Sequence, residues 1–254
     1  MTAAAPRLPS FYRLVAFDRI DSTNEEGRRQ AAAGAAEGTL LWAREQLAGR
    51  GRRGRAWQSP PGNLYVSLVL RPACAPATAA QLSFVTAVGL GAALDGLLPA
   101  GTRVQYKWPN DVLVGGRKVA GILLETSASP GPALDWLVVG VGVNVESCPD
   151  DAPFPATSLG AAGAGEASVA GVLEAFARHF LDWYRQWRTE GFAPIRARWL
   201  DGARGLGQPV EARLAGETLA GRFAALDEGG GLVLDLPGGG RRTIAAGEVF
   251  YPGL

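Results

Sequence analysis

The pattern of apolar residues changes near residue 205, and this change limits the architectures open to the chain. Before it, stretches with helical spacing of apolar residues alternate with apolar strand-like runs. After it, short apolar runs are divided by glycine-rich turns, at residues 209–214, 218–226, 232–236, 243–245 and 249–251. Roughly 50 residues of this kind predict a small β-barrel. We therefore predict two domains, residues 1–205 and residues 206–254.

Within the larger part, residues 168–188 carry the clearest helical signal. Val172, Phe176 and Phe180 recur at helical spacing, and Ser168 is a suitable N-cap. Further helices are predicted to begin at Ser22 or Thr23, where capping is expected from at least one residue of 21–24, and at residues 78–98 and 193–200. The predicted strands are residues 39–43, 63–70, 104–106, 112–114, 118–126 and 136–145.

Composition excludes several protein classes. The 254 residues are 47% hydrophobic and 19% charged, which predicts a soluble globular chain with a sizeable core. We see no apolar run near the roughly 20 residues of a membrane span and no secretion signal. The two cysteines, Cys74 and Cys148, are too few for a disulfide framework and favour a reducing cytoplasm. A net charge of +1 argues against a general nucleic-acid coat.

The single histidine, His179, would have to carry any Ser/His/Asp triad or histidine metal site. It lies beside the apolar stripe of residues 168–188, which favours a surface histidine on a helix. Lysine is also scarce, because Lys107 and Lys118 are the only lysines among 25 basic residues. Their clustering suggests a chemical need for an ammonium group, although chance clustering is the alternative.

Residues 44–57, REQLAGRGRRGRAW, alternate glycine with arginine. Glycine adds backbone freedom and the arginines repel one another, so a stable helix or central strand is excluded and a mobile loop is predicted. Glycine amides and guanidinium groups can together hold a phosphate. A solvated basic loop and a nucleic-acid tether are the alternatives. The loop lacks the spacing of a Walker motif.

Residues 107–121, KWPNDVLVGGRKVAG, predict a hairpin with a turn at Pro109 and a tight turn at Gly115 and Gly116. Lys118 should begin the return strand almost opposite Asp111 or its neighbours. The pair is either a plain cross-strand ion pair or an ammonium that neutralises a phosphate or carboxylate during a reaction, held by the aspartate.

Five motifs in order resemble the biotin protein ligase family: DSTN at 21–24, Q46 with AGRGRRGRAWQSPPGNLY at 48–65, KWPND at 107–111, KVAGIL at 118–123 and GVGVNV at 140–145. The resemblance covers almost the whole chain. It implies an α+β fold, in which a mixed β-sheet flanked by helices, as in biotin and lipoate ligases, is followed by an SH3-like barrel. It also implies that biotin and ATP form biotinyl-5'-adenylate and pyrophosphate, after which a lysine of a biotin carboxyl carrier protein domain attacks the adenylate.

The resemblance also implies roles for individual residues. Glycines of residues 140–142 would leave room for biotin beside Gly121, and an arginine lid over the adenylate would exclude water. Lys118, Asp111 and Arg50 would be catalytic, and Asp111 would also hold Mg²⁺ with ATP. The expected biotin-binding residues are Ser22, Thr23, Asn24, Gln46, Arg50, Gly51, Arg52, Lys118 and Gly121. The expected nucleotide-binding residues are Arg50, Arg52, Arg55, Trp57, Asn110 and Asn144.

The sequence departs from the family pattern in two places. Only 20 residues precede the first motif, too few for the DNA-binding helix-turn-helix of some members, so we expect no sequence-specific DNA binding. The segment FPATSL at 154–159 lacks the tryptophan that some members place over adenine, and Phe154 is the candidate replacement. We expect a cytoplasmic monomer or weak homodimer without membrane attachment. The alternative functions are a lipoate protein ligase and a nucleic-acid-binding module that uses residues 50–55.

Overall fold

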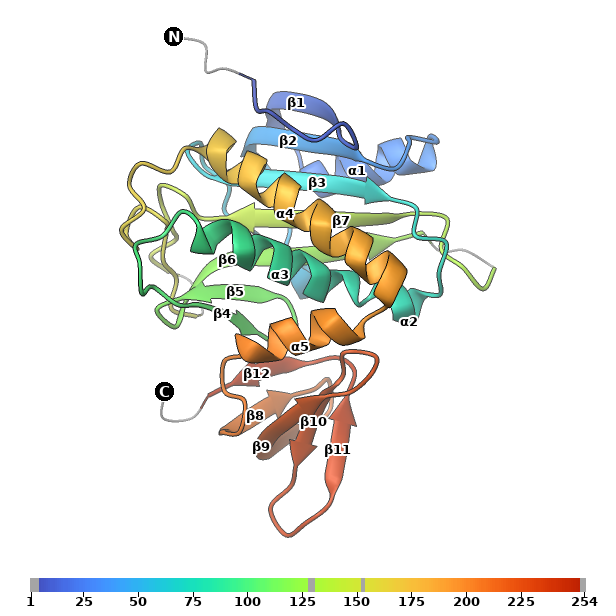
Figure 1. Ribbon diagram of the computed structural model, residues 1–254, viewed down its shortest axis with the longest axis vertical. Coiled ribbons are helices and arrows are strands. Elements are labelled where there is room, and N and C mark those ends of the chain that lie inside the picture. Colours follow the sequence, from blue (N-terminus) through green and yellow to red (C-terminus); the bar gives the residue numbers. More distant parts are fainter. Residues whose placement is uncertain (1–4, 128–130, 152–153, 252–254) are drawn as a thin grey trace.

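The computed structural model describes residues 5–127, 131–151 and 154–251. Figure 1 shows a large layered domain with a smaller β-domain beneath it. The large domain is built on a seven-stranded sheet with the order β1-β2-β3-β7-β6-β5-β4. Its strands are β1 (Arg13–Ile20), β2 (Thr39–Gln46), β3 (Leu64–Leu70), β4 (Val104–Lys107), β5 (Asp111–Val114), β6 (Arg117–Thr126) and β7 (Leu137–Val143). The β1–β2 pair is parallel and the other pairs are antiparallel, so the sheet is mixed, as the resemblance implied.

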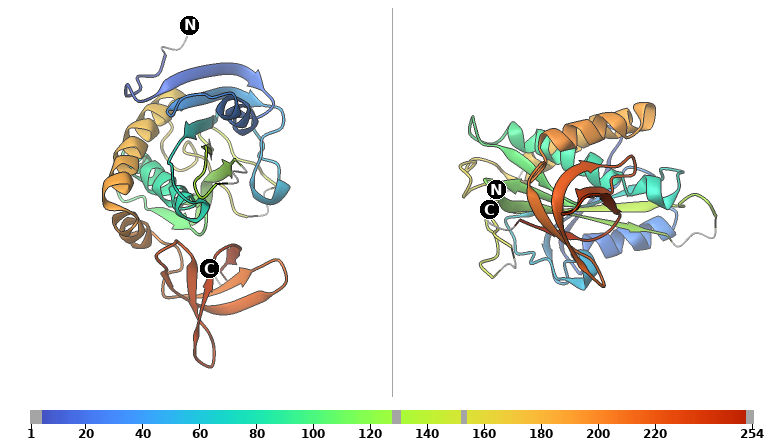
Figure 2. Two further views of the ribbon diagram at one scale, coloured as in Figure 1. Left: turned by 90° about the vertical axis from the view of Figure 1, so that its right-hand side faces the viewer. Right: turned by 90° about the horizontal axis from the view of Figure 1, so that it is seen from below.

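The centre of the sheet is formed by β3 and β7, whose sequences LYVSLVL and LVVGVGV are almost entirely buried. Near-continuous apolar strands of this kind require cover on both faces. Helices α3 (Leu82–Asp95) and α4 (Val169–Glu190) cover one face, and α1 (Thr23–Ala32) covers the other. Figure 2 shows the same layers from the side.

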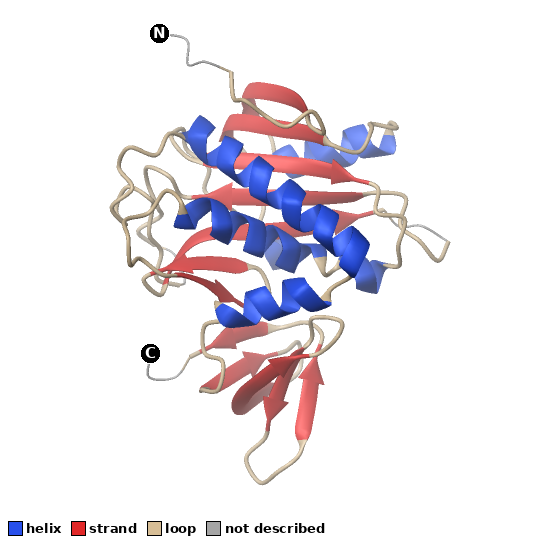
Figure 3. Cartoon of the chain, viewed as in Figure 1, coloured by secondary structure: helices blue, strands red, loops and turns tan. Residues whose placement is uncertain are grey.

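The strongest helix prediction is confirmed by α4, at whose start Ser168 Oγ accepts a hydrogen bond from the Gly171 amide at 3.1 Å. The helix predicted at residues 78–98 forms as α2 (Pro76–Ala79) and α3. A short helix, α5 (Ala193–Asp201), ends the large domain (Figure 3). Residues 13–17 of β1 were not predicted as a strand, because this half-exposed edge strand mixes polar with apolar residues.

The expectation that no apolar stretch reaches the length of a membrane span needs correction. Among the described residues, the stretch Pro76–Asp95 is 20 residues long and has a mean hydropathy of 1.5. By length and composition alone, it could cross a membrane. A core helix meets the same criteria. Here 67% of the apolar window is buried inside the protein, where α3 packs on α4 and on the sheet.

The small domain is a five-stranded antiparallel sheet with the order β11-β10-β9-β8-β12, consistent with the SH3-like fold that was expected. The strands are β8 (Pro209–Arg213), β9 (Thr218–Leu226), β10 (Leu232–Asp235), β11 (Arg241–Ile244) and β12 (Glu248–Phe250). The Trp108 indole N–H donates to the Gly230 carbonyl at 2.9 Å, and Trp199 of α5 packs against Phe223 of β9. These contacts hold the small domain so that β12 borders the large domain's cavity.

Candidate active site

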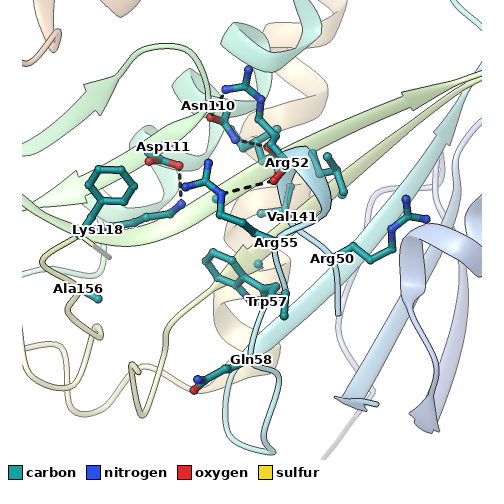
Figure 4. Close-up of a pocket in the computed structure, with 18 of the residues that line it drawn as sticks. Arg50, Arg52, Arg55, Trp57, Gln58, Asn110, Asp111, Lys118, Val141 and Ala156 are labelled. Carbon is teal, nitrogen blue, oxygen red and sulfur yellow. Dashed lines mark hydrogen bonds and ion pairs between the residues drawn. The ribbon is translucent and has the colours of Figure 1, made fainter. Parts of the chain in front are cut away.

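A cavity of about 250 Å³, here called the first cavity, lies between the start of α1, the arginine loop, β5, β6 and β7. Figure 4 shows part of its lining. Every site residue predicted from the sequence lines this cavity: Ser22, Thr23, Asn24, Gln46, Arg50, Gly51, Arg52, Arg55, Trp57, Asn110, Asp111, Lys118, Gly121 and Asn144. The fold therefore brings motifs that are far apart in sequence to one place.

A buried polar network lines the cavity at the start of α1. Gln46 Oε1 accepts hydrogen bonds from the Thr23 amide at 2.8 Å and the Thr23 hydroxyl at 3.0 Å. The Gln46 amide in turn donates to Ser59 Oγ at 2.9 Å. Ser22 occupies the N-cap position of α1, but its side chain makes no capping hydrogen bond. Ser22 is therefore not the capping side chain among residues 21–24; Asp21 accepts a hydrogen bond from the Ser22 amide at 2.7 Å, and Gln46 accepts one from the Thr23 amide.

The side chain of Asn24 is held between three strands. Its Oδ1 lies 2.6 Å from Ser67 Oγ of β3, and its amide donates to Glu125 Oε2 of β6 at 2.9 Å. A Cβ atom added to Gly140 of β7 would collide with this amide. Gly140 therefore makes room for the Asn24 side chain, which lines the cavity. A larger residue at position 140 would displace that side chain.

The wall of the cavity is apolar and is covered by Trp57. A Cβ added to Gly121 would lie 2.9 Å from Trp57 Cζ3, and one added to Gly142 would lie 2.5 Å from Trp57 Nε1. The two glycines thus allow the indole to lie flat on β6 and β7. Trp57 Nε1 is buried and has no hydrogen-bond partner among the described residues, which leaves a donor available at the wall.

Lys118 and Asp111 form a close ion pair, with 2.6 Å between Lys118 Nζ and Asp111 Oδ1 (Figure 4). Their side chains are only 23% and 11% exposed. The strand register pairs Asp111 with Gly121 and Lys118 with Leu113, and an irregularity after Val112 shifts the register between these pairs. The predicted cross-strand proximity is confirmed, although the two residues are not direct strand partners.

The turn between β4 and β5 presents Asn110 to the cavity. Asn110 donates to the Ile122 carbonyl at 2.6 Å and accepts from Arg52 Nη1 at 3.1 Å, so it joins the arginine loop to β6. Asn144, at the end of β7, donates to the Thr157 carbonyl at 3.0 Å. These bonds hold both amides in place beside the cavity, and they engage both the nitrogen and the oxygen of Asn110 but only the nitrogen of Asn144.

The arginine loop folds back on itself as a hairpin-like turn. The Gly51 amide donates to the Arg55 carbonyl at 2.7 Å, and Arg52–Gly54 form a single short 3-10 turn. Neither a regular helix nor a central strand forms, as predicted. Arg53 has a φ of 57°, a left-handed conformation that is uncommon outside glycine.

Three arginines of this loop, Arg50, Arg53 and Arg55, lie within ion-pair distance of carboxylates from three other segments. Arg50 pairs with Glu25 of α1 and lies 3.4 Å from Glu125 of β6. Arg55 pairs with Glu248 of β12. Arg52 is the most enclosed of them, and burial lowers the pKa of its guanidinium. The loop therefore closes over the cavity and touches both domains.

Sequence reasoning missed the residues that support this site, chiefly Ser59, Ser67, Glu125 and Glu248. Each is a single polar residue in a strand or loop; Ser59 lies within the motif at 48–65 but was given no role, and the other three belong to no motif. Phe154, the candidate for adenine stacking, lines the cavity but lies against the Lys107 ammonium, 3.8 Å from its ring centroid. His179 is half-buried on α4 and does not line the cavity, so no histidine enters its chemistry.

Metal binding by the chain alone has little support in the described residues, where no group of three or more His, Cys, Asp or Glu side chains could hold an ion. Mg²⁺ is commonly held by one or two carboxylates together with the phosphates of a nucleotide. Asp111 fits that arrangement, since its carboxylate lines the cavity beside the phosphate-binding candidates.

Comparison with known proteins agrees with this geometry. Residues 8–201 match the biotin/lipoate A/B protein ligase family, and residues 205–251 match the biotin protein ligase C-terminal domain. A biotin--[acetyl-CoA-carboxylase] ligase from Paracoccus denitrificans is 45% identical over 92% of this chain and 99% of its own length. The bifunctional ligase/repressor BirA of Bacillus subtilis is 35% identical over 92% of this chain and 72% of its own length.

Among solved structures, the biotin protein ligase from Aquifex aeolicus in complex with biotin and ATP superimposes with a TM-score of 0.79. It is 28% identical and covers 94% of this chain and 98% of its own. The family match spans the sheet, the arginine loop and the small domain, and it agrees with the motifs that converge on the first cavity. The chain belongs to the biotin protein ligases within the biotin/lipoate A/B protein ligase family.

Proposed function

We propose that this protein is a biotin--[biotin carboxyl carrier protein] ligase, which activates biotin with ATP and transfers it to a carrier lysine. One observation carries the proposal: the predicted biotin, phosphate and catalytic residues all line the first cavity. Relatives named as biotin--[acetyl-CoA-carboxylase] ligases support the biotin branch over a lipoate ligase. The arginine loop is paired with acidic residues, which gives no support to the nucleic-acid alternative.

The buried polar network would bind the ureido head of biotin. A cyclic urea presents N–H donors and a carbonyl acceptor, so it needs directional polar partners within an otherwise apolar pocket. Ser22, Thr23, Asn24 and Gln46 supply such partners, and their positions are fixed by hydrogen bonds to one another and to Ser59 and Ser67. The thiophene ring and the valeryl chain would lie against the Trp57 indole, which covers Gly121 and Gly142.

Lys118 would act where negative charge accumulates. In the first half-reaction an oxygen of the biotin carboxylate attacks the α-phosphorus, and the charge in the transition state is spread over the phosphate oxygens. An ammonium already held in place by Asp111 stabilises that charge without the cost of reorganisation. Its partial burial strengthens the attraction relative to that in water.

Asp111 would have two further roles at the same place. Mg²⁺, delivered with ATP, would be held by the Asp111 carboxylate and the nucleotide phosphates, and it would neutralise phosphate charge. In the second half-reaction, a carboxylate beside the adenylate attracts the acceptor lysine of the carrier domain and can receive its proton. Asn110 and Asn144 would hydrogen-bond the nucleotide.

The arginine loop would serve as the lid. Arg50, Gly51 and Arg52 would close over the adenylate, with Arg55 holding the phosphate region from outside. An ordered lid keeps water from the mixed anhydride, which would otherwise hydrolyse. Glu25 and Glu125 lie beside Arg50, and Glu248 pairs with Arg55, so substrate phosphates would have to compete with these carboxylates for the two arginines.

Three further assignments concern the cellular location, the domain boundaries and the oligomeric state. We place the protein in the cytoplasm, since Cys74 and Cys148 are free thiols, which is usual in a reducing compartment. The division into residues 1–205 and 206–254, and the monomer or weak homodimer, stay predictions.

The direct test is incubation with ATP, Mg²⁺, biotin and a carrier domain, followed by mass spectrometry of the carrier. We expect a mass increase of one biotinyl group on a single lysine, with biotin-dependent release of pyrophosphate. Lipoate in place of biotin is the control. Modification by lipoate without modification by biotin would favour the lipoate ligase instead, and tight salt-dependent DNA binding without either activity would favour the nucleic-acid module.

A further inference from the structure

Glu125 of β6 contacts both the buried polar network and the arginine loop. Its Oε2 accepts a hydrogen bond from the Asn24 amide at 2.9 Å, and its Oε1 lies 3.4 Å from Arg50 Nη2 and 3.9 Å from Arg28 Nη1. The side chain is only 16% exposed. Glu125 does not itself line the first cavity, so an effect on a ligand bound there must pass through a neighbouring residue.

The buried polar network contains two side-chain amides, and the main chain fixes the orientation of one of them. A side-chain amide has a donor end and an acceptor end, which a rotation of 180° exchanges. The Thr23 backbone N–H can only donate, so it faces Gln46 Oε1. Gln46 Nε2 then donates to Ser59 Oγ, whose hydroxyl donates to the Trp57 carbonyl. The orientation of Gln46 therefore needs no other side chain to determine it.

The orientation of the Asn24 amide has a different origin. Its Oδ1 lies 2.6 Å from Ser67 Oγ, but a hydroxyl can donate or accept and so tolerates either end of the amide. The Ser67 proton has a second acceptor available, because Thr23 Oγ1 lies 2.8 Å away. An ionised carboxylate can only accept. Within the described part of the chain, Glu125 is therefore the group that decides which end of Asn24 faces Ser67.

We propose that Glu125 is a positioning residue of the biotin site, which fixes the donor and acceptor ends of the Asn24 amide; this role rests on the proposed function. In the observed orientation, Glu125 takes one N–H of the amide and Ser67 takes one lone pair of its oxygen. One N–H and one lone pair remain for a ligand. A cyclic urea carries its donors and its acceptor in a fixed order. Reversal of the amide would set donor against donor or acceptor against acceptor.

The two oxygens of Glu125 face different partners, which makes Glu125→Gln the informative substitution. Oε1 faces the guanidinium groups of Arg28 and Arg50, and Oε2 faces Asn24. In the glutamine variant one of these positions becomes an NH₂ group. It cannot be the position beside the arginines, because donors would then oppose donors. The NH₂ group should therefore face Asn24 and force its amide to rotate by 180°.

The test is titration of biotin into the full chain without ATP, for the wild type, Glu125→Gln, Asn24→Ala and the double variant. Because the reversed amide loses a hydrogen bond to biotin, we expect Glu125→Gln to weaken biotin binding about tenfold. In the Asn24→Ala background, the same substitution should change binding by less than about twofold, since Glu125 acts through Asn24. Additive losses would overturn the proposal, because an effect through folding or overall charge persists without Asn24.

Glu25→Gln is the matched control. Glu25 lies beside the same two arginines, at 3.1 Å from Arg28 Nη1 and in an ion pair with Arg50, but the hydrogen bond of the Asn24 amide goes to Glu125. The control should bind biotin within about twofold of the wild type. An equal loss in both glutamine variants would assign the effect to the arginines and overturn the proposal.

Glu125→Asp keeps the negative charge beside the arginines but is one methylene shorter, which withdraws the carboxylate from Asn24. It should also weaken biotin binding, and wild-type affinity in this variant would contradict the positioning role.

Steady-state kinetics separate positioning from catalysis. In biotin-dependent pyrophosphate release, Glu125→Gln should raise the KM for biotin about tenfold and leave kcat within about twofold, because the reacting phosphate would lie at Lys118. A lower kcat with an unchanged KM would overturn the proposal. A wild-type protein that binds no biotin would contradict the proposed function itself, whereas biotin binding with additive variants would contradict only the role of Glu125.

Discussion

Replacing Lys118 with glutamine tests the chemistry most directly. The Lys118 ammonium, held 2.6 Å from Asp111 and only 23% exposed, would lie against the reacting phosphate. Two unit charges about 4 Å apart at an effective dielectric of about 20 attract by about 4 kcal/mol. Because Lys118 is partly exposed, the attraction is weaker than this figure. Removing a single oxyanion donor slows other enzymes roughly 10²- to 10³-fold. We expect Lys118→Gln to slow adenylate formation by that factor.

The assay is biotin-dependent release of pyrophosphate, with Arg117→Gln as the control. Arg117 is the exposed neighbour of Lys118 on β6, bonded to the Ala156 carbonyl and outside the first cavity. The control should retain near-normal release. If Lys118→Gln stays within about tenfold of the wild type, the electrostatic argument is wrong.

A loss of stability must be kept apart from this effect. Lys118→Gln leaves Asp111, whose side chain is 11% exposed, without its cation. An unpaired buried carboxylate can cost about 3 to 5 kcal/mol of folding free energy. The double variant Asp111→Asn with Lys118→Gln removes that unpaired charge. It should recover stability in thermal unfolding but not adenylate formation, whereas recovery of both would show that stability alone caused the defect.

Three further perturbations follow from the structure. Gly140→Ala places a Cβ against the Asn24 amide and should cost about 1 to 3 kcal/mol of stability as well as biotin affinity, measured by titration; unchanged biotin binding would contradict the assigned pocket wall. Arg52→Gly should loosen the lid, so that adenylate escapes and labels bystander proteins, and labelling confined to the carrier would refute the lid role. Burial lowers the pKa of Lys107 below its ordinary value of 10.5, so the unfolded chain binds more protons there and stability should rise as pH approaches 10.5. In Lys107→Met, the free energy of unfolding, measured by denaturant titration at several pH values, should rise less with pH. An unchanged pH dependence would contradict the lowered pKa of Lys107.

Helices and strands could be predicted where the pattern of neighbouring apolar residues alone specifies them. The helix of residues 168–188 appeared as α4 because apolar residues three and four apart share one face, and Ser168 supplies the cap. The buried strands β3 and β7 were likewise evident from continuous apolar runs. The start of β1 was not, since an exposed edge strand needs no regular alternation.

The supporting residues of the site had no such signal. Ser67 and Glu125 meet Asn24 only because β3, β7 and β6 lie side by side in one register. Glu248 reaches the arginine loop from the other domain, 193 positions from Arg55. Contacts at such separations depend on how the strands pair and how the domains dock, which no local pattern records.

The two lysines illustrate the division between sequence and tertiary structure. Their scarcity, the hairpin and the family motifs were enough to single out Lys118 and to place it near Asp111. Only the fold decided that an irregularity in the strand pairing brings their side chains together. Only the fold placed Lys107 among aromatic rings in a second cavity. Local sequence determines which backbone conformations are favourable, whereas the burial and pairing of a charge depend on what distant segments pack around it.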